Sequence, residues 1–408
     1  MKVAIIGAGL TGLSAAISLK DYVNVKIFEK NDVGGLASSY CKGYCIEKFY
    51  HHCFKRDEEL IKLIRRFGLS KKLVWRVAKI GCEVNGKIYP LNTPFEILRY
   101  PYLSLYDKIK LAIFTLKSKS RNYEKEDYKS VVEGIREELG ENLLNSFFMP
   151  LLRSKFGGNY KEVSYAWLLA RVAIRSNRKY SGEELGYLKN GFNQLIERMV
   201  DEVDVTKKEA KLEKFGGYEV CGEKFDAVIY TGSLNSLDKK LAETINLPKI
   251  KYQSSVCALI SLKEKLTNIY WTNITSDLTF GALIEHTNFM DFEDYGEHLI
   301  YLASYSTPDG WLFKCDNETL RKMYLKDLKV FGVSEKDVRW IKVFKAKYSS
   351  PIYEKGYIKK ITDYRTPLKG FYIAGLTSKP NYPERSMNGS IKAGKEVAKV
   401  LKSDFKIN

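Results

Sequence analysis

Two of the four histidines in this 408-residue chain stand side by side, as His51 and His52 of the segment EKFYHHCF. Imidazole can bind a metal, accept a proton or hold a substrate. Three thiols lie close by in sequence, those of Cys41, Cys45 and Cys53. Zinc motifs usually bring ligands in two pairs on turns, and neighbouring side chains of a strand point to opposite faces. A metal held by both histidines is therefore disfavoured, and the surrounding elements must decide what chemistry the segment does.

A glycine-rich turn lies upstream of this segment. Residues 2–6, KVAII, are typical of a strand buried in a parallel sheet, GAGLTG follows at once, and 13–19 continue as an apolar helix. A second apolar run then ends in Glu29. This order predicts a dinucleotide site, because the glycines admit a pyrophosphate at the helix start and the acid binds ribose hydroxyls. The expected contacts are Gly7, Ala8, Gly9, Leu10, Thr11, Gly12, Glu29 and Lys30.

A second glycine pair follows in FEKNDVGGLASSY. Together, the two glycine motifs resemble the opening of the flavin amine oxidase, phytoene desaturase and protoporphyrinogen oxidase superfamily, in which the second pair touches FAD. The resemblance implies a non-covalently bound FAD and adds contacts from Gly34, Gly35, Leu36, Ala37 and Ser38. The chain departs from the family in a shorter gap after Glu29 and in lacking an arginine there.

Two later regions extend the resemblance. Residues 225–232 are typical of a buried strand that ends in a turn, and 370–375 of another, followed by a helix from 387 to about 401. The resemblance implies that the closing helix points its N-terminus at the flavin ring. It also implies FAD contacts from Val205, Thr231, Gly232, Gly375, Met387 and Asn388. Blocks along nearly the whole chain look like the uncharacterised protoporphyrinogen-oxidase-like branch, although Leu376 stands where that family usually has an acid or amide.

We therefore expect an α/β protein with two parts. A Rossmann-type FAD-binding domain, with a parallel sheet and helices, would comprise residues 1–50, 185–240 and 365–408. An α+β substrate domain would be formed by two insertions. The first, 51–184, is predicted to be mostly helical, with helices over 56–68, 131–152 and 162–177, and the second, 245–360, alternates as a sheet does.

The double histidine follows the second glycine pair by about a dozen residues, where related flavoenzymes run a strand beside the isoalloxazine. We expect one of His51 and His52 to be catalytic and to face the flavin or substrate, and which one stays open. Structural histidines are the alternative. The other candidates for the substrate pocket are Tyr50, Glu285, His286, Arg153 and Arg385, with Arg171 and Arg175 as further arginines that could hold a carboxylate or diphosphate.

Composition restricts the partners. The net charge of +18 favours anionic ones, whereas no nucleic-acid-binding motif is present, so we expect no nucleic acid. Seven cysteines without a signal peptide predict a cytoplasmic protein in which most thiols are reduced and buried. A capped helix over 104–116 with an aromatic, basic approach could pack on the core or lie on a membrane surface, so peripheral membrane contact stays open, as does the oligomeric state.

The missing second GxGxxG argues that electrons enter from the substrate and not from a nicotinamide. The first hypothesis is an FAD-dependent oxidoreductase, whether oxidase, dehydrogenase or desaturase, that takes hydride from a small apolar, cyclic or anionic substrate onto flavin N5. A rival is a non-redox flavoenzyme resembling UDP-galactopyranose mutase, which an arginine pair around a diphosphate would favour. A flavin-bearing scaffold or electron relay is the third reading, and it predicts a shallow, solvent-filled flavin face.

Overall fold

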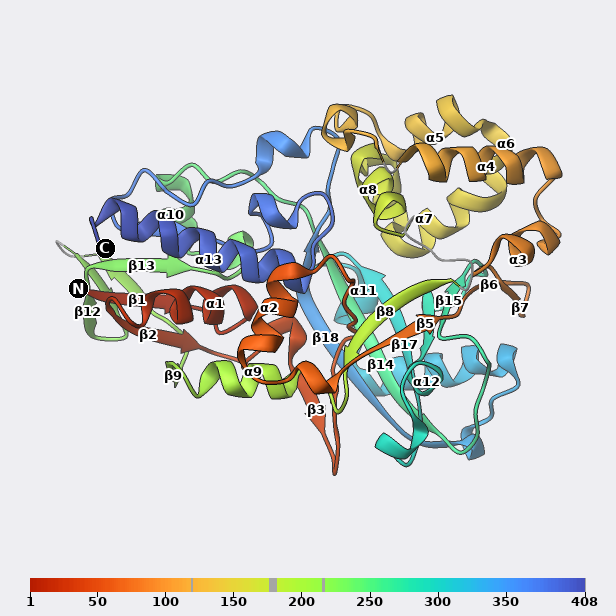
Figure 1. The fold of residues 1–408 in the computed structure, drawn as a ribbon, viewed down its shortest axis with the longest axis horizontal. Coiled ribbons are helices and arrows are strands. Elements are labelled where there is room, and N and C mark those ends of the chain that lie inside the picture. The colour runs from red at the N-terminus through yellow and green to blue at the C-terminus, as the bar shows by residue number, and fades with distance from the viewer. Residues whose placement is uncertain (119, 176–181, 215–216, 408) are drawn as a thin grey trace.

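The computed structural model describes residues 1–118, 120–175, 182–214 and 217–407. Its first layer is a five-stranded sheet in the order β19-β13-β1-β2-β9, with every neighbouring pair parallel (Figure 1). The strands are β1 (Lys2–Ile6), β2 (Asn24–Glu29), β9 (Asp204–Lys207), β13 (Ala227–Tyr230) and β19 (Phe371–Ile373). The predicted α/β fold with a parallel sheet is thereby confirmed.

Both faces of this sheet are covered. Val3 and Ile5 share one core with the helices α1 (Leu10–Leu19), α9 (Asn193–Val200) and α13 (Met387–Asp404). Ala4 points into a second core, together with the three-stranded sheet of β10 (Leu212–Lys214), β11 (Tyr218–Val220) and β12 (Glu223–Phe225). The unbroken apolar run of β1 follows from this double burial. Both chain ends lie at the same end of the molecule (Figure 1).

A second, seven-stranded sheet has the order β18-β14-β17-β16-β15-β6-β7. Its pairs are antiparallel except for β15 with β6. The strands are β6 (Ile80–Val84), β7 (Lys87–Pro90), β14 (Tyr252–Leu262), β15 (Trp271–Ile274), β16 (Ala282–Glu285), β17 (His298–Ser306) and β18 (Val338–Pro351). The helix α12 (Asn317–Leu328) buries Leu320, Tyr324 and Leu328 in the core on one face of this sheet.

The first insertion, residues 51–184, contains more β-strands than we expected from its sequence. It supplies β6 and β7, and also β5 (Leu73–Ala78), which pairs with β8 (Glu183–Leu188). The β6–β7 turn consists of Asn85 and Gly86, both with positive φ, and Asn-Gly is a strong hairpin signal that the prediction overlooked.

From Pro94 to Arg175 this insertion is mostly helical and forms the lobe at the upper right of Figure 1. Its helices are α3 (Pro94–Arg99), α4 (Leu105–Ser118), α5 (Val131–Leu139), α6 (Glu141–Leu143), α7 (Met149–Phe156) and α8 (Tyr165–Arg175). The helix expected over 131–152 is interrupted because Gly140 takes φ 89°. The expected end of the next helix, residues 176–177, lies outside the described residues. α2 (Glu58–Arg66) stops before Gly68, as predicted.

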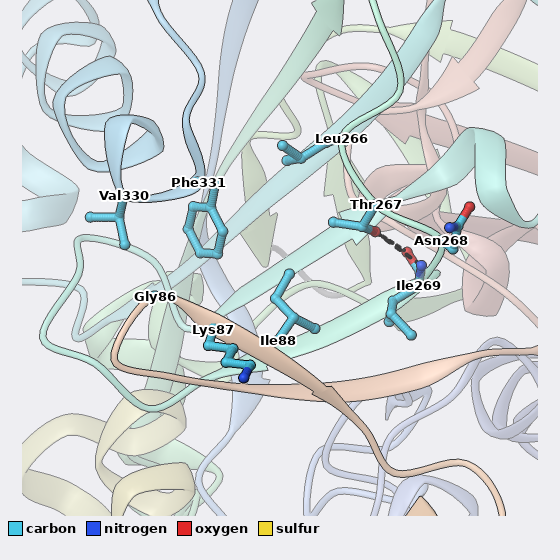
Figure 2. Close-up of a pocket in the computed structure, with 9 residues that line it drawn as sticks. All are labelled: Gly86, Lys87, Ile88, Leu266, Thr267, Asn268, Ile269, Val330 and Phe331. Atoms are coloured by element: carbon cyan, nitrogen blue, oxygen red, sulfur yellow. Dashed lines mark hydrogen bonds between the residues drawn. The ribbon is translucent and has the colours of Figure 1, made fainter.

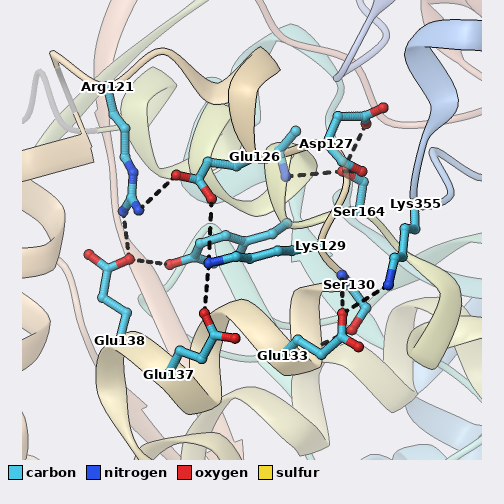
Figure 3. Close-up of polar contacts among 12 residues, drawn as sticks. Arg121, Glu126, Asp127, Lys129, Ser130, Glu133, Glu137, Glu138, Ser164 and Lys355 are labelled. Carbon is cyan, nitrogen blue, oxygen red and sulfur yellow. Dashed lines mark hydrogen bonds and ion pairs between the residues drawn. The ribbon is translucent and has the colours of Figure 1, made fainter.

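A buried carboxylate ties the helical lobe to the C-terminal segment. Asp127, 4% exposed, accepts hydrogen bonds from Ser164 Oγ at 2.9 Å, Tyr382 Oη at 2.7 Å and the Ile358 amide at 3.0 Å. Around it, surface ion pairs join Lys129 to Glu137 and other partners (Figure 3). The lobe is therefore held to the sheet domains by a buried polar contact as well as by its apolar core.

Most of the cysteines are reduced, as expected, but one pair is not. The hairpin of β3 (Ser39–Cys41) and β4 (Cys45–Glu47) places Cys41 opposite Cys45, and the two form a disulfide. Counting cysteines could not reveal this pair, because the hairpin register brings them together. Cys53, Cys82 and Cys257 are reduced and buried.

No helix among the described residues is long and apolar enough to cross a membrane. No group of three His, Cys, Asp or Glu side chains there is arranged to hold a metal ion.

Candidate functional site

The first glycine turn joins the end of β1 to the start of α1. Gly7 has φ 107°, and a Cβ on Gly12 would overlap the Gly7 carbonyl oxygen. A Cβ on Gly9 would meet nothing within 4 Å, and Gly9 caps α1 without any side-chain hydrogen bond. The turn therefore presents open backbone at Gly9 and uncapped N–H groups at the helix start, which suits a pyrophosphate.

The second glycine pair lies directly against the first turn. Gly34 forms a parallel bridge with Gly9 and donates its N–H to the Ala8 carbonyl at 2.8 Å. A Cβ on Gly35 would stand 3.5 Å from the Gly9 Cα. Gly35 opens the short 3-10 helix Gly35–Ala37, which includes Leu36 and leads to the buried Ser38. Two glycine motifs that are separated in sequence by a whole helix and strand thus form one wall.

Glu29 ends β2 beside this wall. Its buried carboxylate accepts hydrogen bonds from the Ala8 amide at 2.8 Å and the Asn31 amide at 2.7 Å. These bonds fix the acid at the turn, where a ribose would lie. Lys30 does not join it, since its ammonium reaches out to Glu209 at 3.3 Å in an exposed pair. Val205 lies on β9, in register with Ile27.

The later FAD segments meet at the same edge of the sheet. Thr231 Oγ1 donates to the Ile6 carbonyl at 2.9 Å and lies against Gly7. It is followed by Gly232, and the Gly375 Cβ position lies 3.4 Å from the Thr231 carbonyl oxygen. The buried Asn381 donates to the Gly375 carbonyl at 2.9 Å and accepts from the Ser386 amide at 3.2 Å. Strand end and helix start are thus held together.

Helix α13 starts beside this junction, and it uses Asn388 in an unexpected way. Met387, its first residue, is nearly buried. The Asn388 Oδ1 accepts the Glu59 and Leu60 amides at 2.8 and 3.1 Å, so it caps α2 and is occupied there. This role depends on a partner near the opposite end of the chain and had no local sequence signal. The two glycine turns, Glu29, Thr231 and Gly375 lie together in one cradle whose open backbone and uncapped helix fit FAD, and Lys30 does not join it.

The segment EKFYHHCF does not continue β4 as the expected strand. Beyond Glu47, only Cys53 pairs in extended fashion, with Gly186. Side chains still alternate: Tyr50 packs edge-on against Trp271 at 4.9 Å between ring centroids, and His52 lies beside Tyr270 and Trp271. His51, between them, has a different environment.

His51 is held by a hydrogen bond to the backbone just before it. Its Nδ1 is 2.5 Å from the Phe49 carbonyl oxygen, so Nδ1 carries the proton and Nε2 is left as an acceptor. Burial lowers the pKa of His51 to about 4; the bond to Phe49 opposes this, and the nearby Arg385 guanidinium lowers it further. His51 is therefore neutral at pH 7 and can accept a hydrogen bond or a proton.

Arg385 immediately precedes the N-cap of α13. Within the described residues its guanidinium forms no hydrogen bond or ion pair, yet its charge acts on His51, Tyr50 and Tyr305. The Tyr50 and Tyr305 hydroxyls hydrogen-bond to each other. Arg171 lies near the same two tyrosines but is paired with Glu384 at 2.8 Å. The site thus holds one unpaired cation beside a neutral imidazole and two phenols, which suits an anionic substrate group.

Three further candidates have partners of their own. Glu285 is buried and accepts from the Leu266 and Thr267 amides, so it braces a loop. His286 is enclosed by tyrosine rings and bonds Tyr295 Oη at 2.7 Å. Arg153 is exposed and stacks on Tyr160. Their partners in the fold give them structural tasks, and we leave them out of the site. The side chain of Arg175 is outside the described set.

A surface depression of about 470 Å³ also lies elsewhere (Figure 2). It is formed by the β6–β7 hairpin, the loop 266–269 and residues 330–331. None of the cradle residues contributes to it, so its size does not mark the reaction site.

His286 predicts a pH dependence of stability. Burial lowers its pKa from 6.5 to about 3, so the unfolded chain binds a proton that the folded chain refuses. The contribution of the neutral His286 ring to the free energy of unfolding is full above pH 6.5. It is lost as the pH falls, and the loss reaches about 2.5 kcal/mol at pH 4.5. Urea unfolding of His286→Phe should therefore lose less stability between pH 7 and 4.5 than wild type. His298→Phe, at a partly exposed ring, should reduce the pH dependence of the free energy of unfolding less. If wild type and His286→Phe lose stability equally between pH 7 and 4.5, the pKa of His286 is not lowered by folding.

Three residues of the site escaped the sequence reasoning. The hydroxyl of Tyr305, on β17 of the seven-stranded sheet, hydrogen-bonds to that of Tyr50. Glu384 forms an ion pair with Arg171, and Asn381 donates a hydrogen bond to the Gly375 carbonyl. Only Asn381 had a usable signal. It lies between the glycine that ends β19 and the start of α13, and the family's usual polar residue is absent at Leu376.

Comparison with known proteins adds three findings. A family model described as flavin containing amine oxidoreductase matches residues 10–402. A coproporphyrinogen III oxidase from Staphylococcus aureus is 30% identical over 224 residues, which are 52% of this chain and 45% of that protein. The chain therefore spans less than half the length of this curated relative.

Solved structures agree in fold. A putative protoporphyrinogen oxidase from Exiguobacterium sp. 255-15 superposes with a TM-score of 0.79 at 18% identity, over 98% of both chains. A reduced UDP-galactopyranose mutase gives 0.70 at 18% identity, over 98% of this chain and 95% of that one. At these identities the likeness extends to the fold alone.

Proposed function

The chain belongs to the flavin-containing amine oxidoreductase family, whose cofactor is FAD, and from this premise we propose that it oxidises a small molecule by hydride transfer. We assign the FAD-binding domain to residues 1–50, 185–240 and 365–408, and the substrate domain to 51–184 and 245–360. The observation that carries the proposal is the glycine cradle at the start of α1, together with Arg385, which directly precedes the N-cap of α13 and whose charge acts on His51.

The substrate class follows from the side chains at this point. Bound FAD would supply the acceptor for a hydride from a substrate C–H or C–N centre. Arg385 would hold a carboxylate of the substrate, and the Tyr50–Tyr305 pair would line its apolar body. His51, neutral with Nε2 free to accept, would take a hydrogen bond or a proton from the oxidised centre. We therefore assign His51, and not His52, to the flavin side.

A substrate panel tests this proposal. Purified protein should show flavin absorbance, and anaerobic mixing with carboxylated porphyrinogens, polyenes, amines and sugar nucleotides should bleach it with one of the first three classes. Bleaching by none of them, together with turnover of a sugar nucleotide by the reduced protein, would favour a mutase. That alternative rests on Arg171 and Arg385 lying near the same tyrosines.

Substitution of Arg385 tests its proposed role in binding a substrate carboxylate. Arg385→Met should lower kcat/KM for a carboxylate-bearing substrate about thirtyfold, because an ion pair is lost in a partly buried site. An uncharged polyene should be affected little. Arg153→Met, at an exposed arginine stacked on Tyr160, serves as the matched control and should behave as wild type. Equal loss for charged and uncharged substrates would remove Arg385 from substrate recognition.

We also propose peripheral contact with a membrane. The net charge of +18 attracts the protein to anionic surfaces in general. Vesicle sedimentation tests this contact independently of catalysis.

A further inference from the structure

Helix α4 is turned with its apolar stripe toward solvent. Leu105, Ile109 and Leu116 are 65%, 50% and 67% exposed, and Tyr106 and Ile113 are also exposed. The opposite side of the helix carries Asp107, which is 3% exposed and accepts from Ser104 Oγ and Asn142 Nδ2. A surface helix of a globular protein normally shows the reverse arrangement, so this stripe has no partner within the described residues.

The apolar surface continues onto α3 and the connecting loop. Phe95 and Leu98 are 55% and 54% exposed, and Tyr102 is 43% exposed. Residues 95–116 thus supply eight of the fifteen exposed large apolar side chains among the described residues. We call this surface the α3–α4 face, made of Phe95, Leu98, Tyr102, Leu105, Tyr106, Ile109, Ile113 and Leu116. Clustered exposure of this kind marks an interaction site.

Cations outnumber acids along this face. Residues 94–118 contain four cations, Arg99, Lys108, Lys110 and Lys117, and two acids, Glu96 and Asp107. Both acids are occupied: Asp107 is buried, and Glu96 accepts the Asn92 and Thr93 amides in a capping box. In the described part of the chain none of the four cations pairs with a carboxylate. They border the apolar stripe without a counter-ion.

Two of the cations lie on aromatic rings of this face. The Arg99 guanidinium stacks on Phe95 at 3.9 Å, and the Lys110 ammonium lies over Tyr106 at 4.6 Å from the ring centroid. The Lys108 and Lys110 ammoniums also donate to the Leu98 and Leu139 carbonyls at 2.7 and 3.2 Å. Positive charge and exposed apolar area thus lie on the same surface, a combination typical of helices in the plane of an anionic membrane interface.

We infer that the α3–α4 face is the surface by which this protein binds an anionic lipid bilayer, lying in the headgroup layer with α4 parallel to the membrane. The inference rests on the proposed membrane contact and gives it a location. A second copy of the chain is a poorer occupant, because a symmetric interface would bring the unpaired cations of both copies together.

Vesicle sedimentation with substituted protein tests this location. The holoprotein is mixed with vesicles of phosphatidylcholine alone or of phosphatidylcholine with phosphatidylserine. Wild type should bind the anionic vesicles at least about tenfold more tightly, and added salt should weaken binding. Ile109→Glu with Leu116→Glu should lower this binding about a hundredfold, because two buried apolar contacts become charges. Flavin content should stay unchanged.

The chain offers a matched control. Trp311→Glu with Val330→Glu alters two apolar side chains of similar exposure, 65% and 46%, outside the α3–α4 face, and should bind vesicles like wild type. Equal binding by wild type and the α4 variant would overturn the location and leave the membrane contact standing. No vesicle binding by wild type would overturn both. A wild-type dimer that the α4 substitutions dissociate, seen by light scattering without vesicle binding, would assign the face to a second copy.

Discussion

Replacing Gly9 by valine is expected to remove FAD while leaving the protein folded. A Cβ at Gly9 meets no atom within 4 Å, and its backbone has φ −76°, which any residue adopts. The branched side chain would instead fill the space through which a pyrophosphate approaches the start of α1. We expect the affinity for FAD to fall at least about a hundredfold, or roughly 3 kcal/mol. Titration of apoprotein with FAD measures this, and circular dichroism checks the fold.

Substitutions at two other glycines serve as controls for Gly9→Val. Gly158 also has open space around it, so Gly158→Val should bind FAD like wild type. Gly12→Val should fail to fold, because its side chain would overlap the Gly7 carbonyl oxygen. If Gly9→Val keeps its full affinity for FAD, the cofactor does not lie against this turn.

Among the substitutions that still fold, Asp127→Ala should cause the largest loss in the free energy of unfolding. Three donors, Ser164 Oγ, Tyr382 Oη and the Ile358 amide, would lose a buried acceptor. An unsatisfied buried donor costs about 1–3 kcal/mol, and the three are not additive, so we expect a loss of about 4 kcal/mol. Urea unfolding of the FAD-bound protein measures it.

Two further substitutions serve as controls for the buried carboxylate. Asp127→Asn keeps an acceptor oxygen and should lose less than half as much. Glu137→Ala, which removes an exposed partner of Lys129 in the same cluster, should change nothing measurable (Figure 3). A loss from Asp127→Ala no larger than from Glu137→Ala would mean that the lobe is held by its apolar core alone.

The dinucleotide half of the fold could be predicted because its constraints are local. Gly7, Gly9 and Gly12 act on each other within one turn, and the run that ends in Glu29 is the next strand of the sheet. Hydrophobic patterns therefore located β1, α1, β2 and α13 without any knowledge of distant partners.

The remaining features depend on contacts that a local pattern does not contain. The period of α4 predicted an apolar stripe, but periodicity says nothing about what the stripe faces, and here it faces outward. Glu285 and Asn388 are occupied by backbone amides of other segments. The assignment of His51 over His52 likewise needed Arg385, which enters from the C-terminal segment of the chain.

The order of strands in the parallel sheet has a consequence for synthesis. β1 and β2 emerge first, β9 and β13 follow only after the whole helical lobe, and β19 and α13 come from the C-terminal end of the chain. Translation at about 5–20 residues per second takes roughly 20–80 s for this chain. Throughout most of that time the glycine turn exists without Thr231, Gly375 or the closing helix. FAD should therefore be captured only after α13 has emerged from the ribosome, and chains stalled before Thr231 should carry none.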